Sequence, residues 1–548
     1  MRLWKAVLLT LILIAVAAAL LLLFVTRRGF RASTAPPRWE AHVARAIRNF
    51  SIPRSESNLK NPAGDSAHAL EQGRDTFLNR CAFCHGIDGA GRTPVGTNLY
   101  PRVPDLRSSL TQNLTDGDLH YIIENGVQLT GMPAGAAHHA ASTDDSWPIV
   151  TFIRSLRPLD AGHSRQAFTP AAAHYVGSQA CAKCHAEIYE RWKKTPMANV
   201  VRDPRSHPDA IAADPTHNPV SPFAPADVAF IYGSLWKQRY FVKQGDDYVP
   251  LGVQWNFAQH TWLPYHVPAQ KGDWWTAFYP EDNHQRPTGP LCDGCHSIDY
   301  NIHTHQVAEW NVGCERCHGP GSEHSAHPTR ENIFNPSAMD SISSNDTCIQ
   351  CHSQGQPLAN PIEGQYYDWP VGYRVDLRLQ DFWTLETCTL GETTFYYFPD
   401  CTAHKNRMQG NDFAQSVMYR RGITCADCHD VHGTSNYAQL RKPPDQICLD
   451  CHGPSSPNGP HTSTLAAHTH HKDGSTGSQC VACHMPQIQT EGVPGAMVHA
   501  HTFRVITPAM TDQYKIPNPC TLCHADKSTA WAREAMTHWP ETPPWNFR

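Results

Sequence analysis

Cysteine and histidine recur along this 548-residue chain in one fixed pattern, C-x-x-C-H, which occurs nine times. The pattern uses eighteen of the twenty cysteines. Two thiols at this spacing can form thioether bonds to the two vinyl groups of a haem, and the adjacent imidazole can bind its iron. The paired cysteines are Cys81 and Cys84, Cys181 and Cys184, Cys292 and Cys295, Cys314 and Cys317, Cys348 and Cys351, Cys425 and Cys428, Cys448 and Cys451, Cys480 and Cys483, and Cys520 and Cys523. The histidines that follow them are His85, His185, His296, His318, His352, His429, His452, His484 and His524.

A single C-x-x-C pair is also typical of zinc sites and of thioredoxin-like redox centres. Zinc binding requires two such pairs and has no use for a histidine directly after the second cysteine, whereas a redox centre needs only one pair. The nine copies therefore predict nine covalently bound haem c groups. Only 40% of the residues are hydrophobic, so the porphyrins are expected to supply apolar core surface that the side chains lack.

Eight of the nine motifs lie within residues 181–524, one for every 43 residues. At this density most haems must lie close to a neighbour, and a row of closely spaced redox centres conducts electrons. The formal charge of −5 argues against a nucleic-acid-binding protein, which normally carries a basic excess. No catalytic residue outside the haem motifs stands out.

The N-terminus contains a run of 20 uncharged residues, Ala6–Val25, which is long enough to cross a membrane as a helix. A cleaved secretory signal is the alternative, but its small-residue cleavage sites, at Ala15–Ala17 and Ala17–Ala19, would fall inside the run. We therefore predict an uncleaved anchor within residues 1–31. Because bacteria attach haem c outside the cytoplasmic membrane, the remaining chain is expected in the periplasm.

The two cysteines outside the motifs, Cys388 and Cys401, are candidates for a disulfide in this oxidising compartment. The closed loop of 14 residues would stabilise the fold by roughly 3 kcal/mol on the loop-entropy estimate. Two unpaired buried thiols are the alternative.

Residues 32–65 are rich in proline, serine and asparagine and predict a tether around one short amphipathic piece, Trp39–Phe50. The following region, 66–158, predicts a helix before the first motif and two helices after it. These are HALEQGRDTFLNR, LTDGDLHYIIENGV and SWPIVTFIRSL, the last two with apolar residues at helical spacing. A linker is expected over residues 159–175.

Across residues 66–158 this arrangement, with CAFCHGIDGAG and the loop TGMPAG, resembles a class I cytochrome c. In that family the methionine of the loop is the sixth iron ligand, and the matching residue here is Met132. The alternative role for Met132 is that of a buried loop methionine. A thioether ligand would raise the reduction potential relative to a second imidazole.

Residues 176–548 resemble the multihaem group of cytochrome c554, the hydroxylamine oxidoreductases and the octahaem reductases. The resemblance rests on YVGSQACAKCHAEIYERW, CERCHGPGSEH, CADCHDVHG and CVACHMP. It implies an octahaem domain, so that the whole chain is expected to be mainly α-helical with extensive loops. An insertion containing RYFVKQGDDYVPLGVQW, two strand-like runs about a polar turn, predicts a small β-hairpin.

The proximal positions use nine of the 34 histidines, so the number of histidines alone does not identify the distal ligands. The resemblance implies that His324 and His432, which follow two of the motifs, bind neighbouring haems. Other histidines lie between attachment sites and are candidates for binding iron. The alternative is that they are ordinary surface histidines, which more often bind no metal. These further candidates are His461, one of His468, His470 and His471 (for which we take His470), His501 and His404.

One position departs from the relatives, which often carry W-x-x-S-x-H-A with a distal histidine after the first motif of this region. This chain has methionine, Met197, in the segment that begins at Trp192. Met197 either replaces the imidazole or leaves one iron open to substrate.

These observations favour an electron-transfer protein that links a membrane-side donor to a periplasmic acceptor. Its expected partners are other redox proteins and the membrane, without nucleic acid. A multihaem enzyme, such as a nitrogen-oxide reductase or a hydroxylamine oxidase, is the alternative, although no motif is the C-x-x-C-K variant of the pentahaem nitrite reductases. A third possibility is a subunit of a cytochrome filament, which an uncleaved anchor would oppose.

Overall fold

The protein was analysed as a computed structural model. It describes residues 36–64, 66–86, 89–91, 99–135, 146–156, 173–265, 286–405, 407–436, 438–453, 464–490 and 494–539, with the single positions 16 and 96. The chain divides into two compact units, Met1–Ser164 and Arg165–Arg548, and we consider each by itself. The division falls within the segment expected to be a linker.

Unit 1 is helical, and its three predicted helices are present. They are α4 (Ala67–Arg80), α7 (Asp116–Asn125) and α8 (Ser146–Ser155), and the short helices α5 (Ala82–His85) and α6 (Ser109–Gln112) lie between the first two. Polar caps define where two of them begin: Ser66 accepts a hydrogen bond from the Ala69 N–H, and Thr115 and Asp118 form a capping box.

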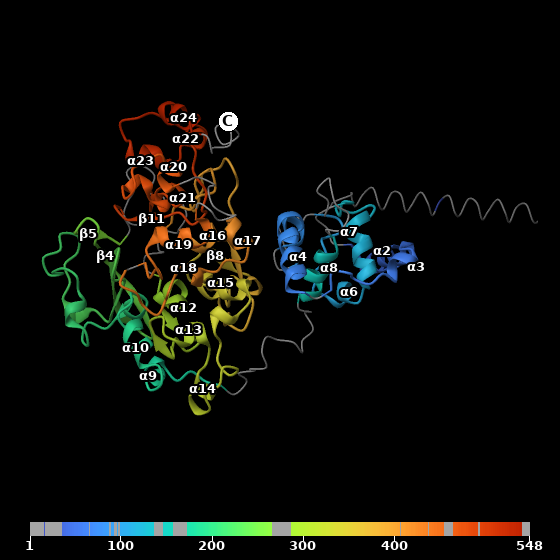
Figure 1. Ribbon diagram of the computed structural model, residues 1–548. Coiled ribbons are helices and arrows are strands. Elements are labelled where there is room, and N and C mark those ends of the chain that lie inside the picture. Colours follow the sequence, from blue (N-terminus) through green and yellow to red (C-terminus); the bar gives the residue numbers. More distant parts are fainter. Residues whose placement is uncertain are drawn as a thin grey trace, which may run out of the picture. The chain divides into compact units, whose positions relative to one another are not determined.

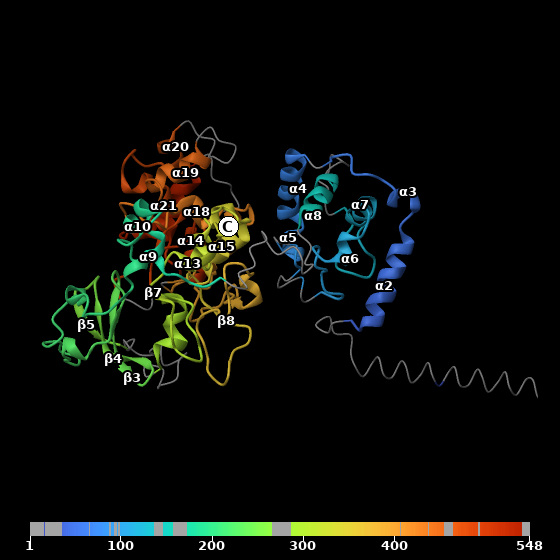
Figure 2. The same ribbon diagram turned by 90° about the horizontal axis from the view of Figure 1, so that it is seen from below.

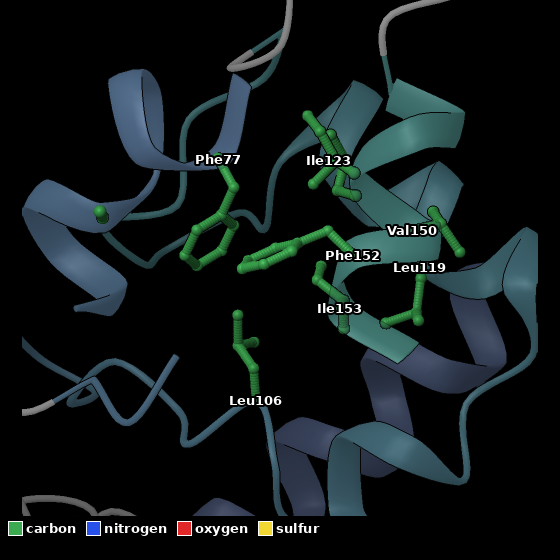
Figure 3. Close-up of a cluster of buried hydrophobic side chains, with 9 residues drawn as sticks. Phe77, Leu106, Leu119, Ile123, Val150, Phe152 and Ile153 are labelled. Carbon is green, nitrogen blue, oxygen red and sulfur yellow. The ribbon is translucent and has the colours of Figure 1, made fainter. Parts of the chain in front are cut away.

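The core of unit 1 lies where α4, α7 and α8 meet. Phe77 of α4 packs against Phe152 of α8, with ring centroids 5.0 Å apart, and both rings lie in one buried apolar cluster with Ile123 (Figure 3). Helices α4 and α8 approach closely because residue 73 is glycine. A Cβ atom at Gly73 would lie 1.8 Å from the Pro148 carbonyl oxygen.

The region expected to be a tether is helical where the structure describes it. Helix α2 (Arg38–Ser51) covers the predicted amphipathic piece, and α3 (Arg54–Ser57) follows it. The Thr115 hydroxyl at the start of α7 donates to the Ser57 carbonyl, 2.7 Å away. The end of this region is therefore part of the compact unit. Its prolines, Pro37 and Pro53, directly precede the two helices instead of breaking them.

Unit 2 contains the predicted β-hairpin, but within a larger sheet. Strands β3 (Lys237–Gln244) and β4 (Asp247–Asn256) pair in antiparallel fashion about a two-residue turn, as expected. Three further short strands extend the hairpin to a five-stranded antiparallel sheet in the order β1 to β5. These are β1 (Val201–Arg202), β2 (Phe230–Tyr232) and β5 (Thr261–Pro264). The sheet lies to one side of the helices of this unit (Figures 1 and 2).

The rest of the described part of unit 2 consists of short helices joined by long loops, and three two-stranded ribbons. The strands are β6 (Ser297–Ile298) with β7 (Glu309–Trp310), β8 (Gly355–Pro357) with β9 (Trp383–Leu385), and β10 (Gln487–Gln489) with β11 (Met497–His499). The helices are α9 (Ser178–Cys181), α10 (Ala186–Trp192), α12 (Gly294–His296), α13 (Glu315–His318), α14 (Ser322–Ala326), α15 (Ser341–Ile349), α16 (Gln409–Gln415), α17 (Val417–Arg420), α18 (Cys425–Cys428), α19 (Pro444–His452), α20 (Leu465–Thr469), α21 (Cys480–His484), α22 (Pro508–Tyr514), α23 (Pro519–Cys523) and α24 (Thr529–Thr537).

Two further expectations concern a disulfide and a membrane anchor. Cys388 and Cys401 form a disulfide, so the pairing suggested by the sequence is confirmed. Within the described ranges, no helix combines the length and the apolar character needed to cross a membrane. The expected anchor, residues 6–25, lies outside those ranges except for Val16.

Candidate haem-binding sites

All nine C-x-x-C-H motifs are described, and most of them lie on a short helix or at its end. Helices α5, α13, α18, α19, α21 and α23 each contain part of one motif. Residues three apart on a helix face the same side, so this local structure presents both thiols of a motif to one partner. None of the eighteen motif cysteines takes part in a disulfide.

Four proximal histidines face a second histidine ring across a nearly constant gap. The ring centroids in each pair are 6.1–6.4 Å apart, and in three pairs the rings are parallel to within 22°. The second ring comes from a distant part of the sequence in three pairs, and from 16 residues before the proximal histidine in the pair of His484 with His468. The pairs are His185 with His324 (6.4 Å), His318 with His432 (6.1 Å), His484 with His468 (6.3 Å) and His524 with His471 (6.2 Å).

This spacing fits one metal ion between two imidazoles. Stacked rings in direct contact lie much closer, as His120 and Trp147 do at 3.9 Å. Two metal–nitrogen bonds of about 2 Å, with about 1.1 Å from each nitrogen to its ring centre, give a separation of about 6.2 Å. The residues present therefore fit haem iron bound by two axial histidines.

Hydrogen bonds orient these rings through Nδ1, which leaves Nε2 for the metal. His318 donates to the Phe334 carbonyl at 2.6 Å, and His471 donates to the Thr469 carbonyl at 2.6 Å. His432 donates to the Asp430 carboxylate at 3.0 Å. A carbonyl or carboxylate partner on one nitrogen is the usual outer-shell support of a metal-bound histidine.

Loss of hydration favours the neutral form that binds metal at several proximal imidazoles. It lowers the pKa of His85 and of His296 to about 4. It also lowers the pKa of His318 and of His484.

Neighbouring motifs in unit 2 are joined directly to one another by hydrogen bonds. The Cys314 N–H donates to the Ser178 hydroxyl, which lies just before the motif at Cys181, at 2.9 Å. The Cys425 N–H donates to Asn345 of α15, the helix that leads into the motif at Cys348, at 2.9 Å.

The C-terminal motifs continue this series. The Cys480 N–H donates to Asp445 of α19, the helix that carries the motif at Cys448, at 2.8 Å. Helix α21 also packs against α23, which carries Cys520. Burial and, to a smaller extent, the neighbouring Cys448, Asp427 and Cys451 together raise the pKa of Cys428 to about 11. The five motifs from Cys348 to Cys520 therefore form a connected series, and the motifs at Cys181 and Cys314 form a pair.

The strand β3 presents two basic residues toward the third motif, Cys292–His296. Lys237 and Arg239 lie on the same face of the strand as Phe241, because successive residues of a strand alternate between faces. Phe241 belongs to the apolar cluster against which Cys292 packs. Arg239 thus carries positive charge toward the attachment site, whereas burial lowers the pKa of Lys237 well below its usual value.

Two more basic residues come from the loop after the disulfide. Lys405 is buried, with its ammonium nitrogen 3.7 Å from the centre of the Phe395 ring. Burial lowers the pKa of Lys405 well below its usual value, and Arg407 lowers it further. Arg407 also lowers the pKa of His296. The surroundings of the third motif thus contain two guanidinium groups and two lysines whose neutral forms burial favours.

In unit 1 the first motif follows α4, and His85 lies beside Phe77 of the core, with ring centroids 6.3 Å apart. Met132 lies in the loop between α7 and α8 and is half-buried. Two hydrogen bonds hold its backbone: its N–H donates to the Thr130 hydroxyl, and its carbonyl accepts from the Val127 N–H, each at 3.1 Å. The role of Met132 as iron ligand remains a prediction.

Two of the expected distal ligands, His324 and His432, thus face proximal histidines, whereas His470 differs from the expectation. The structure pairs His468 and His471 with proximal rings and stacks His470 on Trp539, with centroids 4.5 Å apart. The reason is local: His470 follows the end of α20 in a left-handed conformation, which turns its ring away. The sequence narrows the choice to three histidines but shows no signal of this turn.

For the remaining expected ligands, the structure gives contacts other than a ring pair with a proximal histidine. Burial is the main cause that lowers the pKa of His501 to about 4. The nearby His429 and His352 contribute to the same shift. The Nε2 of His404 lies 3.0 Å from the Thr394 carbonyl oxygen, so that this nitrogen is engaged by backbone. The carbonyl of Met197 accepts from the Val312 N–H at 3.1 Å, close to the motif at Cys314. His461 lies outside the described residues.

Three family models match separate parts of the chain. Residues 68–153 match the family of subunit III of cbb3-type cytochrome c oxidase, residues 180–217 match cytochrome c554 and c-prime, and residues 419–456 match a doubled C-x-x-C-H motif. The multihaem cytochrome MtrA of Shewanella baltica (strain OS185) is 24% identical over 151 residues. That alignment covers 25% of this chain and 41% of MtrA.

Among solved structures, the outer cell wall cytochrome OcwA is similar over 67% of this chain and 86% of its own, with a TM-score of 0.54 and 21% identity. The undecahaem cytochrome from the S-layer of Carboxydothermus ferrireducens matches with a TM-score of 0.39 and 17% identity, over 90% of this chain and 73% of its own. The likeness to OcwA concerns the fold. The repeated attachment motifs and the family matches show that the chain is a multihaem c-type cytochrome.

Proposed function

We propose that the protein is a nine-haem electron carrier, held on the periplasmic side of the bacterial inner membrane by its N-terminal helix. In this proposal unit 1 exchanges electrons with the row of eight haems in unit 2. The chain thereby links a membrane-side donor to a periplasmic redox partner. The relatives named above are themselves described as cytochromes, which supports electron transfer as the general role.

The observation that carries the proposal is the set of four histidine pairs at 6.1–6.4 Å. An iron with two axial histidines has no free position for substrate, so such a haem can transfer electrons but not bind a small molecule. The connected attachment points give electrons short steps between neighbouring haems. A series of haems whose irons have no free ligand position is suited to passing electrons from one haem to the next.

The proposal assigns five segments: an anchor in 1–31, a connecting segment in 32–65 that contains α2 and α3, a class I cytochrome c domain in 66–158, a linker in 159–175 and an octahaem domain in 176–548. Met132 supplies the sixth ligand of the first haem, and its thioether gives that haem a higher potential than those with two histidines. Such a haem can accept electrons from the lower-potential row or hold them for a soluble partner.

The test is a spectroelectrochemical titration of the full chain in nanodiscs, followed by stopped-flow oxidation with a one-electron acceptor. We expect reversible uptake of nine electrons per chain and the release of all nine to the acceptor. Release of only part of the stored electrons would show that the haems do not form one connected series. The Met132→His variant is the internal reference, because it changes one haem without interrupting the row.

A second candidate function is favoured by the basic surroundings of the third motif. Arg239 and Arg407 would attract a small anion to the haem bound at Cys292–His296, and the anion would favour the protonated forms of the buried Lys237 and Lys405. The His296 ring lies 5.7 Å from the Tyr232 ring. In this candidate function, nitrogen oxides are reduced at the haem bound by His296.

The two functions differ in the spin state of that haem and in its response to anions. A reductase requires a high-spin iron whose spectrum changes when nitrite is added, and Lys405→Met would weaken that change. The Lys193→Met variant, at an exposed position, is the matched control. An oxidised protein that is entirely low-spin and unaffected by nitrite would exclude the reductase.

A further inference from the structure

Helix α2 exposes an apolar stripe that the described part of unit 1 does not cover. Trp39, Val43, Ile47 and Phe50 recur at the spacing of one helix face. Their exposed fractions are 69%, 49%, 64% and 92%. Scattered single apolar residues are normal on a surface, but a continuous stripe of four marks an interaction site.

The polar side of α2, in contrast, faces the rest of unit 1. Glu40, Arg45 and Arg48 are each half-buried. The Tyr100 hydroxyl donates a hydrogen bond to the Glu40 carboxylate, and the charge of Asp118 raises the pKa of Arg48, although burial lowers it overall. An ordinary surface helix buries its apolar face and exposes its polar face. Helix α2 is turned the other way, so its apolar stripe is directed outward.

The position of α2 in the chain indicates what the stripe meets. The uncharged run Ala6–Val25 ends twelve residues before α2 begins. Twelve residues span at most about 40 Å even when fully extended, so α2 remains near the surface of any membrane that the run enters. The connecting residues include Arg27, Arg28 and Arg31, which attract anionic lipid headgroups.

The composition of the stripe is also that of an interfacial helix. Tryptophan is enriched at the boundary between headgroups and acyl chains, and Trp39 is the stripe residue nearest the run. An amphipathic helix of this kind lies in the plane of the boundary with its apolar face among the lipids. In Figures 1 and 2, α2 lies at the outside of unit 1, next to α3.

We propose that α2 lies flat in the headgroup layer, with Trp39, Val43, Ile47 and Phe50 inserted among the lipids. This inference rests on the membrane anchor of the proposed function. The polar side of α2 then holds unit 1, and with it the haem at His85, against the membrane surface. The anchor alone would leave that unit free to move on its connecting segment.

The experiment places the full chain in nanodiscs of phosphatidylethanolamine and phosphatidylglycerol that contain a photoactivatable diazirine lipid. Peptides that carry lipid after irradiation are identified by mass spectrometry. We expect labelling within residues 36–51. The double variant Ile47→Glu, Phe50→Glu should reduce this labelling about fivefold or more, because charged side chains oppose insertion.

The matched control is the double variant Leu110→Glu, Leu129→Glu, which changes exposed apolar residues of the same unit outside α2 and should leave the labelling of α2 unchanged. All variants must keep the haem spectrum of the wild type. A chain that stays in the discs without labelling of α2 would overturn the inference while the anchor stands. A chain that leaves the discs would overturn the anchor and the inference together.

Discussion

A single histidine can determine whether an iron has a free ligand position. The pair of His468 with His484 allows a direct test. Replacing His468 by alanine removes the ring that lies 6.3 Å from the proximal ring. We expect one haem to change from low spin to high spin, which electron paramagnetic resonance at low temperature detects. His470→Ala is the matched control, because that ring stacks on Trp539. A high-spin signal in His470→Ala and none in His468→Ala would reverse the assignment.

The sixth ligand of the first haem can be tested in the same way. Met132→His should keep that haem low-spin but lower its potential, because imidazole replaces a thioether. A redox titration of the full chain measures this as the loss of its highest-potential step. A titration identical to that of the wild type would show that Met132 does not bind the iron.

At the scale of elements, the contact between α4 and α8 depends on Gly73. A methyl group at this position would lie 1.8 Å from the Pro148 carbonyl oxygen, so the helices would have to separate. We expect Gly73→Ala to lower the free energy of unfolding of unit 1 by about 1–3 kcal/mol, as overpacking does. Scanning calorimetry measures the effect. Gly252→Ala, where a Cβ meets no atom within 4 Å, should not change the transition of unit 1.

The start of α15 gives a prediction that depends on pH. Asp340 caps this helix by accepting from the Ser343 N–H at 3.1 Å, and it pairs with Arg378 at 2.8 Å. Burial alone would raise the pKa of Asp340, but Arg378 and the hydrogen bonds from Ser343 outweigh it and lower the pKa to about 2. Because the folded-state pKa is depressed, the stabilisation is complete above the unfolded pKa of about 4 and is lost as pH falls toward 2.

Asp340→Ala should therefore cost about 1 kcal/mol at pH 7, the usual value of a cap, and less at pH 3. Denaturant unfolding at the two pH values measures the difference. Asp381→Ala, a nearby acidic residue on an exposed turn, is the control. An equal loss at both pH values would show that ionisation of Asp340 does not stabilise α15.

Elements whose signal is local could be predicted from the sequence, and elements set by distant contacts could not. The three helices of unit 1 and the hairpin about Gly245 have clear periodicity or a clear turn. Strand β2 is only three residues long and is stabilised by pairing with β3, which local sequence does not show. The attachment sites follow from spacing alone. The distal histidines depend on how loops return to a motif, and His470 shows that a left-handed residue at a helix end decides the choice.

At the scale of the whole molecule, charge should govern exchange with partners. Each oxidised haem with ionised propionates adds roughly −1, so nine haems take the formal charge of −5 to roughly −14. Attraction to a basic soluble cytochrome should then weaken as salt rises from about 0.01 to 0.15 M, since the Debye length falls from about 30 to 8 Å. Stopped-flow rates measure this. A rate that is constant or rises with salt would show that the exchange surface is not acidic.

The proposal as a whole depends on the number of haems that the chain carries. Mass spectrometry of the denatured full-length protein measures this number directly, because thioether-bound haem stays on the chain when the fold is lost. We predict the mass of the 548-residue polypeptide, from which residues 1–31 have not been cleaved, with nine haems. A mass that corresponds to fewer than nine haems would contradict the proposed nine-haem electron carrier.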